Sequence, residues 1–148
     1  RAVRRLSCGP ILVDLLTVVP APSPPSSIHA PESKPECWSV RTCDSPVVNL
    51  TIPGAVERRR RFDVDVLLRV RIPEPAGRCE LGLSLEIDGV RQWSRTVPGQ
   101  TPGEVDSLEY HCRVVIDPGR DTRLRARAAT RHCTLVDLSL SAVEERSA

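Results

Sequence analysis

One segment limits the fold more than any other, because between Arg61 and Ile72 apolar residues recur at every second position. The six residues of this row are Phe62, Val64, Val66, Leu68, Val70 and Ile72. Successive side chains of a strand point to opposite faces, so this spacing places the whole row on one face, whereas a helix would scatter it around its surface. The segment therefore predicts a β-strand with one buried and one solvated face.

The same alternation recurs from Cys37 onward. It predicts further strands at residues 47–52, 80–87, 90–97, 108–116, 123–128 and 135–143. Asp88-Gly89 predicts a two-residue type I′ turn, because both central positions of that turn need positive φ, and Asp117-Pro-Gly-Arg120 predicts a second turn. Regular short strands joined by turns are typical of an all-β fold, and we predict an antiparallel, jelly-roll-like β-sandwich.

The N-terminal part has a different composition. Residues 11–19 predict an eighth strand, and seven of the 14 prolines then fall between Pro10 and Pro35. Proline cannot donate a ladder hydrogen bond, so this stretch predicts an extended connector. We divide the chain into an N-terminal strand with a Pro-rich arm (1–36) and a β-sandwich domain (37–148). The start resembles a secretion signal but lacks a small-residue cleavage site, and no segment approaches the roughly 18 apolar residues of a membrane span.

The charge balance argues against a nucleic-acid binder. The formal net charge is +2, with 21 basic and 19 acidic residues, and Lys34 is the one lysine. Aromatic residues make up only 3% of the chain. Nucleic-acid binders usually carry a larger positive excess, clustered and interleaved with aromatic residues. We therefore expect no nucleic-acid partner.

Cysteine forms an even set of six, at Cys8, Cys37, Cys43, Cys79, Cys112 and Cys133. No two stand in a C-x2-C pair, and no cysteine–histidine cluster has zinc spacing, so we predict no metal site from them. Two alternatives remain open: disulfides in an oxidising compartment, or small buried apolar side chains in a reducing one. We favour disulfides, and hence an extracellular or otherwise oxidising location.

No motif predicts catalysis, so we expect a protein that is not an enzyme and needs no cofactor. The histidines, His29, His111 and His132, stand in the Pro-rich stretch or at polar strand positions, where a solvated surface role is typical. Asp63 and Asp65 share the outer face of one strand, where cross-strand arginines are their expected partners. One alternative is a calcium site built from loop carboxylates, namely Glu104, Asp106 and Asp117.

Two sets of side chains are candidates for ligand binding. Trp93 is predicted to share one strand face with Arg91 and Arg95, which would make an aromatic platform for a sugar ring, flanked by cations. Arg123, Arg125 and Arg127 form a ladder on another strand. If the two strands were neighbours, the sets together would make an electropositive face for a sulfated glycan, a phosphate or an acidic subunit.

The run Arg58, Arg59, Arg60 and Arg61 is the most unusual local feature. It predicts a basic patch for an anionic polymer, a cleavage site for a protease specific for basic residues, or a charged turn whose side chains diverge. The triplet Asn49-Leu50-Thr51 matches an N-glycosylation acceptor, which matters only in a eukaryotic secretory route.

These features predict a non-catalytic structural, assembly or protein-interaction module of a larger complex. Its expected partners are protein subunits, including other copies of the chain, which the Pro-rich arm would reach. The alternative is a carbohydrate-binding β-sandwich module that uses Trp93 and its neighbouring arginines. A sandwich fold alone does not decide between them.

Overall fold

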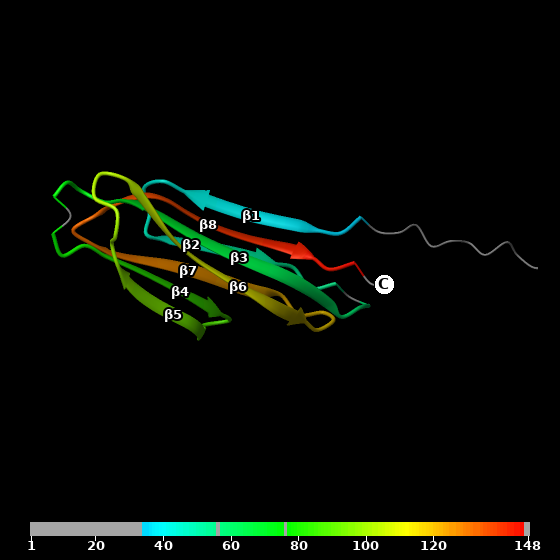
Figure 1. Ribbon diagram of the computed structural model, residues 1–148. Coiled ribbons are helices and arrows are strands. Elements are labelled where there is room, and N and C mark those ends of the chain that lie inside the picture. The colour runs from blue at the N-terminus through cyan, green and yellow to red at the C-terminus, as the bar shows by residue number, and fades with distance from the viewer. Residues whose placement is uncertain (1–33, 56, 76, 147–148) are drawn as a thin grey trace, which may run out of the picture. The chain divides into compact units, whose positions relative to one another are not determined.

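The computed structural model describes residues 34–146 except 56 and 76, and these form two four-stranded antiparallel sheets packed face to face (Figure 1). The strands are β1 (Cys37–Thr42), β2 (Val47–Ile52), β3 (Arg60–Arg71), β4 (Glu80–Ile87), β5 (Val90–Pro98), β6 (Val105–Ile116), β7 (Thr122–Arg131) and β8 (Thr134–Glu144). The predicted all-β sandwich is confirmed. The predicted strand at 11–19 and nearly all of the Pro-rich arm lie outside the described residues.

The strand order follows one simple rule. One sheet has the order β1-β8-β3-β6 and the other the order β2-β7-β4-β5. The antiparallel pairs β4/β5, β3/β6, β2/β7 and β1/β8 are those of one long hairpin, with the β4–β5 turn at its tip. Successive pairs alternate between the two sheets, so the hairpin is rolled up around the core.

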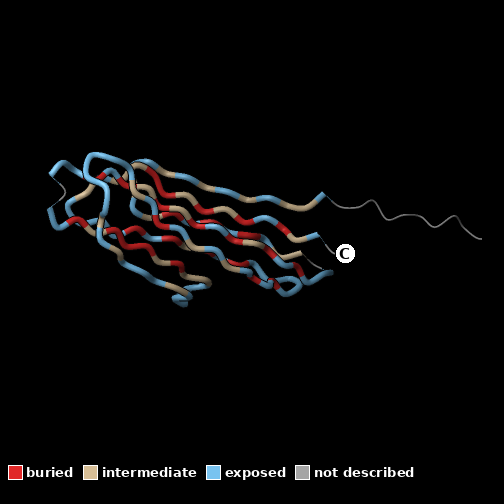
Figure 2. The backbone as a smooth tube through the Cα atoms, viewed as in Figure 1, coloured by how far each residue is buried: buried red, intermediate tan, exposed pale blue. Residues whose placement is uncertain are grey.

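The core lies between the inner faces of the sheets. The apolar row of β3 is at most 1% exposed at every position. Alternate residues of β2, β4 and β7 face it from the other sheet, and those of β8 lie beside it. Figure 2 shows the alternation as buried and exposed residues that succeed one another along the strands. The core is therefore built from the alternation that predicts the strands.

The two predicted turns are present, and one strand is additional. Asp88 and Gly89 have φ angles of 50° and 84°, as a type I′ turn requires. Gly119 has a φ of 72° in the second turn, where the Arg120 amide donates to the Asp117 carbonyl at 3.3 Å. The strand that we did not predict separately is β1, an edge strand with only Trp38 and Val40 packed against the core. Two apolar residues are too few to give a clear pattern.

A buried carboxylate ties three strands together on the outer face of the β1-β8-β3-β6 sheet. The Asp137 side chain in β8 is 2% exposed and accepts hydrogen bonds from Arg69 of β3 and Arg41 of β1, with the Arg69 Nε at 3.0 Å. These hydrogen bonds, chiefly that from Arg69, lower the pKa of Asp137 to about 2, although burial opposes the shift. The ionised form is therefore favoured by folding.

The Asp137–Arg69 pair makes the free energy of unfolding depend on pH. Because folding lowers the pKa of Asp137, its contribution is complete above the unfolded value of about 4 and is lost as pH falls towards about 2. We expect Asp137→Asn to destabilise the protein near neutral pH by about 2 kcal/mol, and the difference from wild type to shrink over that acidic window. Urea unfolding of both proteins across the window measures it. A difference that does not change with pH would contradict this role.

Candidate functional site

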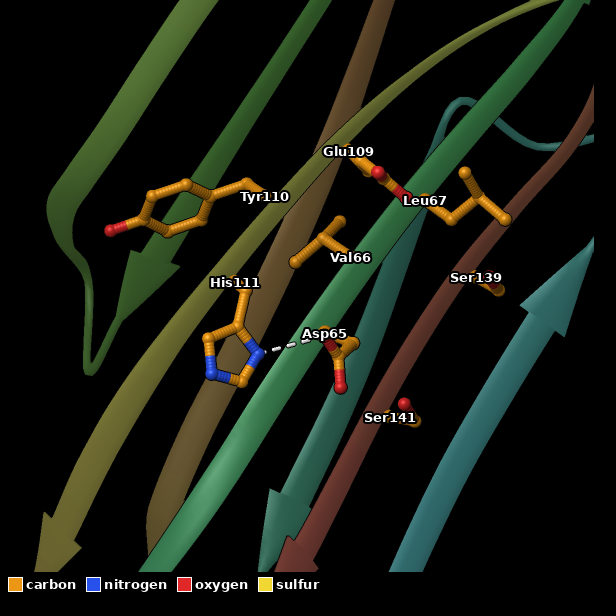
Figure 3. Close-up of a pocket in the computed structure, with 8 residues that line it drawn as sticks. All are labelled: Asp65, Val66, Leu67, Glu109, Tyr110, His111, Ser139 and Ser141. Atoms are coloured by element: carbon orange, nitrogen blue, oxygen red, sulfur yellow. Dashed lines mark hydrogen bonds and ion pairs between the residues drawn. The ribbon is translucent and has the colours of Figure 1, made fainter.

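A shallow hollow lies on the outer face of the β1-β8-β3-β6 sheet, where polar side chains of three strands meet (Figure 3). Its volume is about 440 Å³. The outward-facing residues that line it are Asp65 and Leu67 of β3, Glu109 and His111 of β6, and Ser139 and Ser141 of β8. The outer face of a sandwich strand carries its polar residues, so this hollow follows from the same alternation as the core.

Ion pairs between β3 and β6 form one wall of the hollow. His111 Nδ1 lies 2.8 Å from Asp65 Oδ1, and His111 Nε2 lies 3.7 Å from Asp63. Arg113 Nε lies 3.5 Å from Asp63 and also contacts Glu145. The expected pairing with a cross-strand arginine is confirmed for Asp63 but not for Asp65, whose cross-strand partner is His111.

This group does not form a nucleophilic site. Ser141, Asp65 and His111 lie in one cross-strand row, with Asp65 on the middle strand. Neighbouring strands are about 4.8 Å apart, so Ser141 and His111 are separated by roughly 10 Å. A histidine that activates a serine must lie within hydrogen-bond distance of it, and this one does not. The arrangement supports charge pairing rather than acyl transfer.

Asp106 and Asp117, two of the three carboxylates of the calcium alternative, have other partners. Asp106 Oδ2 accepts a hydrogen bond from the Gln100 amide at 2.6 Å, and Asp117 pairs with Arg59 at 2.8 Å. Over the residues that the structure describes, no group of three or more His, Cys, Asp or Glu side chains is placed to hold a metal ion.

Trp93 is not an open platform. Its ring stacks on Tyr110 of the other sheet, with centroids 4.3 Å apart and planes 9° from parallel, and it packs against the core. A register shift between Leu85 and Glu86 places Trp93 opposite inward-facing Leu85 but Arg91 opposite outward-facing Glu86. The predicted shared face of Trp93 and Arg91 is therefore wrong, because the bulge at Gln92 inverts the alternation there.

The stack of Trp93 on Tyr110 should stabilise the folded protein. We expect Trp93→Ala to lower the free energy of unfolding by about 2 kcal/mol, because a large partly buried ring and its aromatic contact are both lost. Trp93→Phe should keep most of the stability, and Arg95→Ala, at an exposed neighbour, should change it little. Urea unfolding followed by far-ultraviolet circular dichroism measures all three. A Trp93→Ala protein as stable as wild type would instead indicate a ring free for a ligand.

The arginine ladder lies on the outer face of β7, but it does not adjoin β5. Strand β4 separates the two, and Arg95 occupies the face of β5 that Trp93 occupies. The neighbours of the ladder include acids: Arg125 lies opposite Glu86, and the Arg123 amide donates to Asp88 Oδ1 at 2.9 Å. The electropositive face predicted for the two sets together is therefore not formed, because β4 brings carboxylates between them.

The four-arginine run is dispersed by the strand that begins within it. The Arg60 side chain is 1% exposed, pairs with Glu36 at 2.6 Å and lies over the Phe62 ring at 5.2 Å. Arg58 pairs with the buried Glu144 at 2.8 Å. Of the three predicted roles, the diverging charged turn describes this geometry. Arg60, which begins β3, contacts Glu36 just before β1, and Arg58, which precedes β3, contacts Glu144 at the end of β8.

The structure forms no disulfide among the five cysteines it describes, and Cys8 lies outside the described residues. Cys37 begins β1 and Cys43 follows its end, so the six-residue strand holds them about 20 Å apart, whereas a disulfide needs Cα atoms within about 7 Å. Cys133 and Cys79 are neighbours, and Cys133 Sγ donates to the Glu80 carbonyl at 3.3 Å. The predicted disulfide framework finds no support here.

Thiol reactivity should follow burial. Burial, with a smaller contribution from Cys133, raises the pKa of Cys79 to about 11, whereas Cys37 and Cys43 are exposed. We expect iodoacetamide at mildly alkaline pH to alkylate Cys37 and Cys43 first and to leave Cys79 unmodified, because the thiolate is the reactive form. Peptide mass mapping measures this, with the urea-unfolded chain as the control. Equal rates at Cys79 and Cys37 in the folded protein would contradict it.

Three other residues that the sequence singled out are His132, Asn49 and His29. His132 has a φ of 57° in the turn between β7 and β8, and Asn49 is exposed on β2, where it lies opposite Arg125. His29 lies outside the described residues. No helix in the described part of the chain has the length and apolar character that a membrane crossing needs.

Comparison with known proteins does not assign the chain to a family. No protein-family model and no curated protein matches the sequence. Among solved structures, the chain is similar to dimeric latent PorU from Porphyromonas gingivalis, at 12% sequence identity and a TM-score of 0.42. The match covers 76% of this chain and 13% of that one. We draw nothing about function from a likeness of this degree.

Proposed function

We propose that this protein is a non-catalytic structural or interaction module that joins other protein subunits through an open sheet edge. The observation that carries the proposal is β6, a strand of 12 residues that is hydrogen-bonded to β3 on one side and, within the described residues, to no strand on the other. An unpaired strand edge presents backbone donors and acceptors to any chain that can add a strand.

The other edges carry features that hinder strand addition. β5 has a bulge, two exposed arginines and a terminal Pro98, while β1 and β2 have only six residues each. Such features are how sandwich proteins avoid unwanted edge pairing. In contrast, β6 contains no proline or glycine and keeps one register along β3. It is therefore the edge best suited to a partner.

The finer fold assignment is a jelly roll. Its support is the rolled-hairpin strand order, in which pairs alternate between two four-stranded sheets. A jelly roll leaves the two sheet faces and the edges for contacts with other subunits, so this assignment agrees with an assembly role without requiring one.

The carbohydrate-binding alternative has less support. One face of the Trp93 ring is covered by Tyr110, and Arg91 lies on the opposite face of β5. A sugar would have to use the remaining ring face with Arg95 beside it but without Arg91, the other cation that we expected there.

The test compares solution masses of the intact chain and of a chain that begins at Lys34. This start keeps Glu36, which pairs with Arg60 and whose amide donates to Glu144 at 3.1 Å. Residues from Lys34 onward form one compact unit, so the shorter chain should fold. We expect a defined oligomer for the intact chain, measured by light scattering over a concentration series.

The shorter chain then locates the contact. A monomeric shorter chain would assign assembly to the Pro-rich arm, and an oligomeric one would assign it to the sandwich. An oligomeric shorter chain supports assembly through the sheet edge, whereas a monomeric one contradicts the edge as the contact and leaves only the assembly role. Two folded monomers at every concentration would overturn the proposal, and a glycan screen with Trp93→Ala would then be the next experiment.

A further inference from the structure

We propose that the partner of β6 is β6 of a second copy of this chain, paired antiparallel about a two-fold axis at His111. The inference rests on the proposed function and names its partner. The two sheets would join into one continuous eight-stranded sheet, with β6 and its copy at the centre. The grounds are the pattern of charge and apolar side chains along β6, which is complementary to itself in one register.

The outer face of β6 carries opposite charges at equal distances from His111. Glu109 precedes it by two positions and Arg113 follows it by two, so all three share one face of the strand. A two-fold axis at His111 places Glu109 of each copy opposite Arg113 of the other. Directly opposite residues have Cβ atoms about 5 Å apart, close enough for a charge pair, and the symmetry makes two such pairs.

Both charged groups are available for this contact. Glu109 is exposed and, among the described residues, has no ion-pair partner. The Arg113 side chain is 59% exposed, and its contacts with Asp63 and Glu145 are made through its Nε on the β3 side. In the dimer its guanidinium would turn toward the open edge to meet Glu109 of the other copy.

The inner face fits the same register. With the axis at His111, Leu108 lies opposite Val114 of the other copy, and Tyr110 lies opposite Cys112. All four pack against the core or belong to it. The apolar row of the core would thus continue across the new pair of strands, as in a continuous sheet.

Neighbouring registers are less favourable. Moving the axis to Tyr110 places Arg113 opposite Ser107 and Glu109 opposite His111, which already pairs with Asp65, so both Glu109–Arg113 pairs are lost. Moving it to Cys112 places Glu109 opposite Val115 and again loses both charge pairs, and moving it to Glu109 places the two Glu109 carboxylates opposite each other. Like charges directly opposite one another destabilise a strand pair, so the charges select the His111 register.

The first test is a cross-link at the axis. His111→Cys places two thiols directly opposite, within reach of a disulfide. With oxidised glutathione, the two thiols lose two protons and two electrons, and the glutathione disulfide becomes two thiols. We expect a covalent dimer that dithiothreitol reverses. The matched control is Ser141→Cys, on the same sheet face but in β8, which is paired with strands on both sides.

The second test exchanges the charges. Glu109→Arg or Arg113→Glu alone places like charges opposite each other twice in the dimer, so we expect each to weaken dimerisation about tenfold or more. The double variant Glu109→Arg/Arg113→Glu restores opposite charges and should return the dissociation constant to within about threefold of wild type. Sedimentation velocity over a concentration series measures it, and circular dichroism checks that each variant is folded.

The outcomes separate this inference from the proposed function. A His111→Cys cross-link absent from wild type and from Ser141→Cys, together with rescue by the double variant, supports the β6 dimer. If the wild-type chain is an oligomer but the single charge variants match it and His111→Cys does not cross-link, β6 self-pairing is wrong and assembly uses another surface. If the wild-type chain is monomeric at every concentration, both are wrong.

Discussion

The removal of one strand face from water is the constraint on which the sandwich depends. Strand β3 is hydrogen-bonded on both sides, to β6 and β8, and its inner row of five apolar side chains is at most 1% exposed, as is Ile72, which follows the strand. Burying each such side chain contributes roughly 1.5–3 kcal/mol, so this row needs a complete apolar cover. The second sheet supplies it, and the roll of the chain around β3 places every later strand in one of the two layers.

Because the interior is filled by apolar rows, charged groups gather on the outer faces and at the ends of the sheets. Asp137 joins β8 to β1 and β3. The Glu36–Arg60 pair joins the residue before β1 to the start of β3, and the Glu144–Arg58 pair joins the end of β8 to the residues that precede β3. Each uses a carboxylate or guanidinium that is almost fully buried, so removing one partner would leave a costly uncompensated charge. These pairs stabilise the sandwich and are not free to bind a ligand.

The candidate site could be predicted only in part. The alternation indicated correctly that Asp63 and Asp65 lie on the outer face, and cross-strand geometry indicated an arginine partner. It did not indicate that β6 is the edge strand beside them, since edge positions follow from strand order. Nor did it indicate that Trp93 is stacked, because Tyr110 belongs to the other sheet. A single-residue bulge at Gln92 places Arg91 on the strand face opposite to the one that we predicted.

By itself, the sequence determined which segments are strands, which face of each is apolar and where the tight turns fall, because these follow from local periodicity and from the φ preferences of residues such as Gly89. Only the tertiary structure decided which strands are neighbours, and with that the partners of every charge. Arg60 and Arg61 are adjacent in an unbroken basic run, yet one is buried against Glu36 and the other is exposed. The difference arises because side chains alternate across a strand, while the strand's surroundings are contributed by residues far away in the chain.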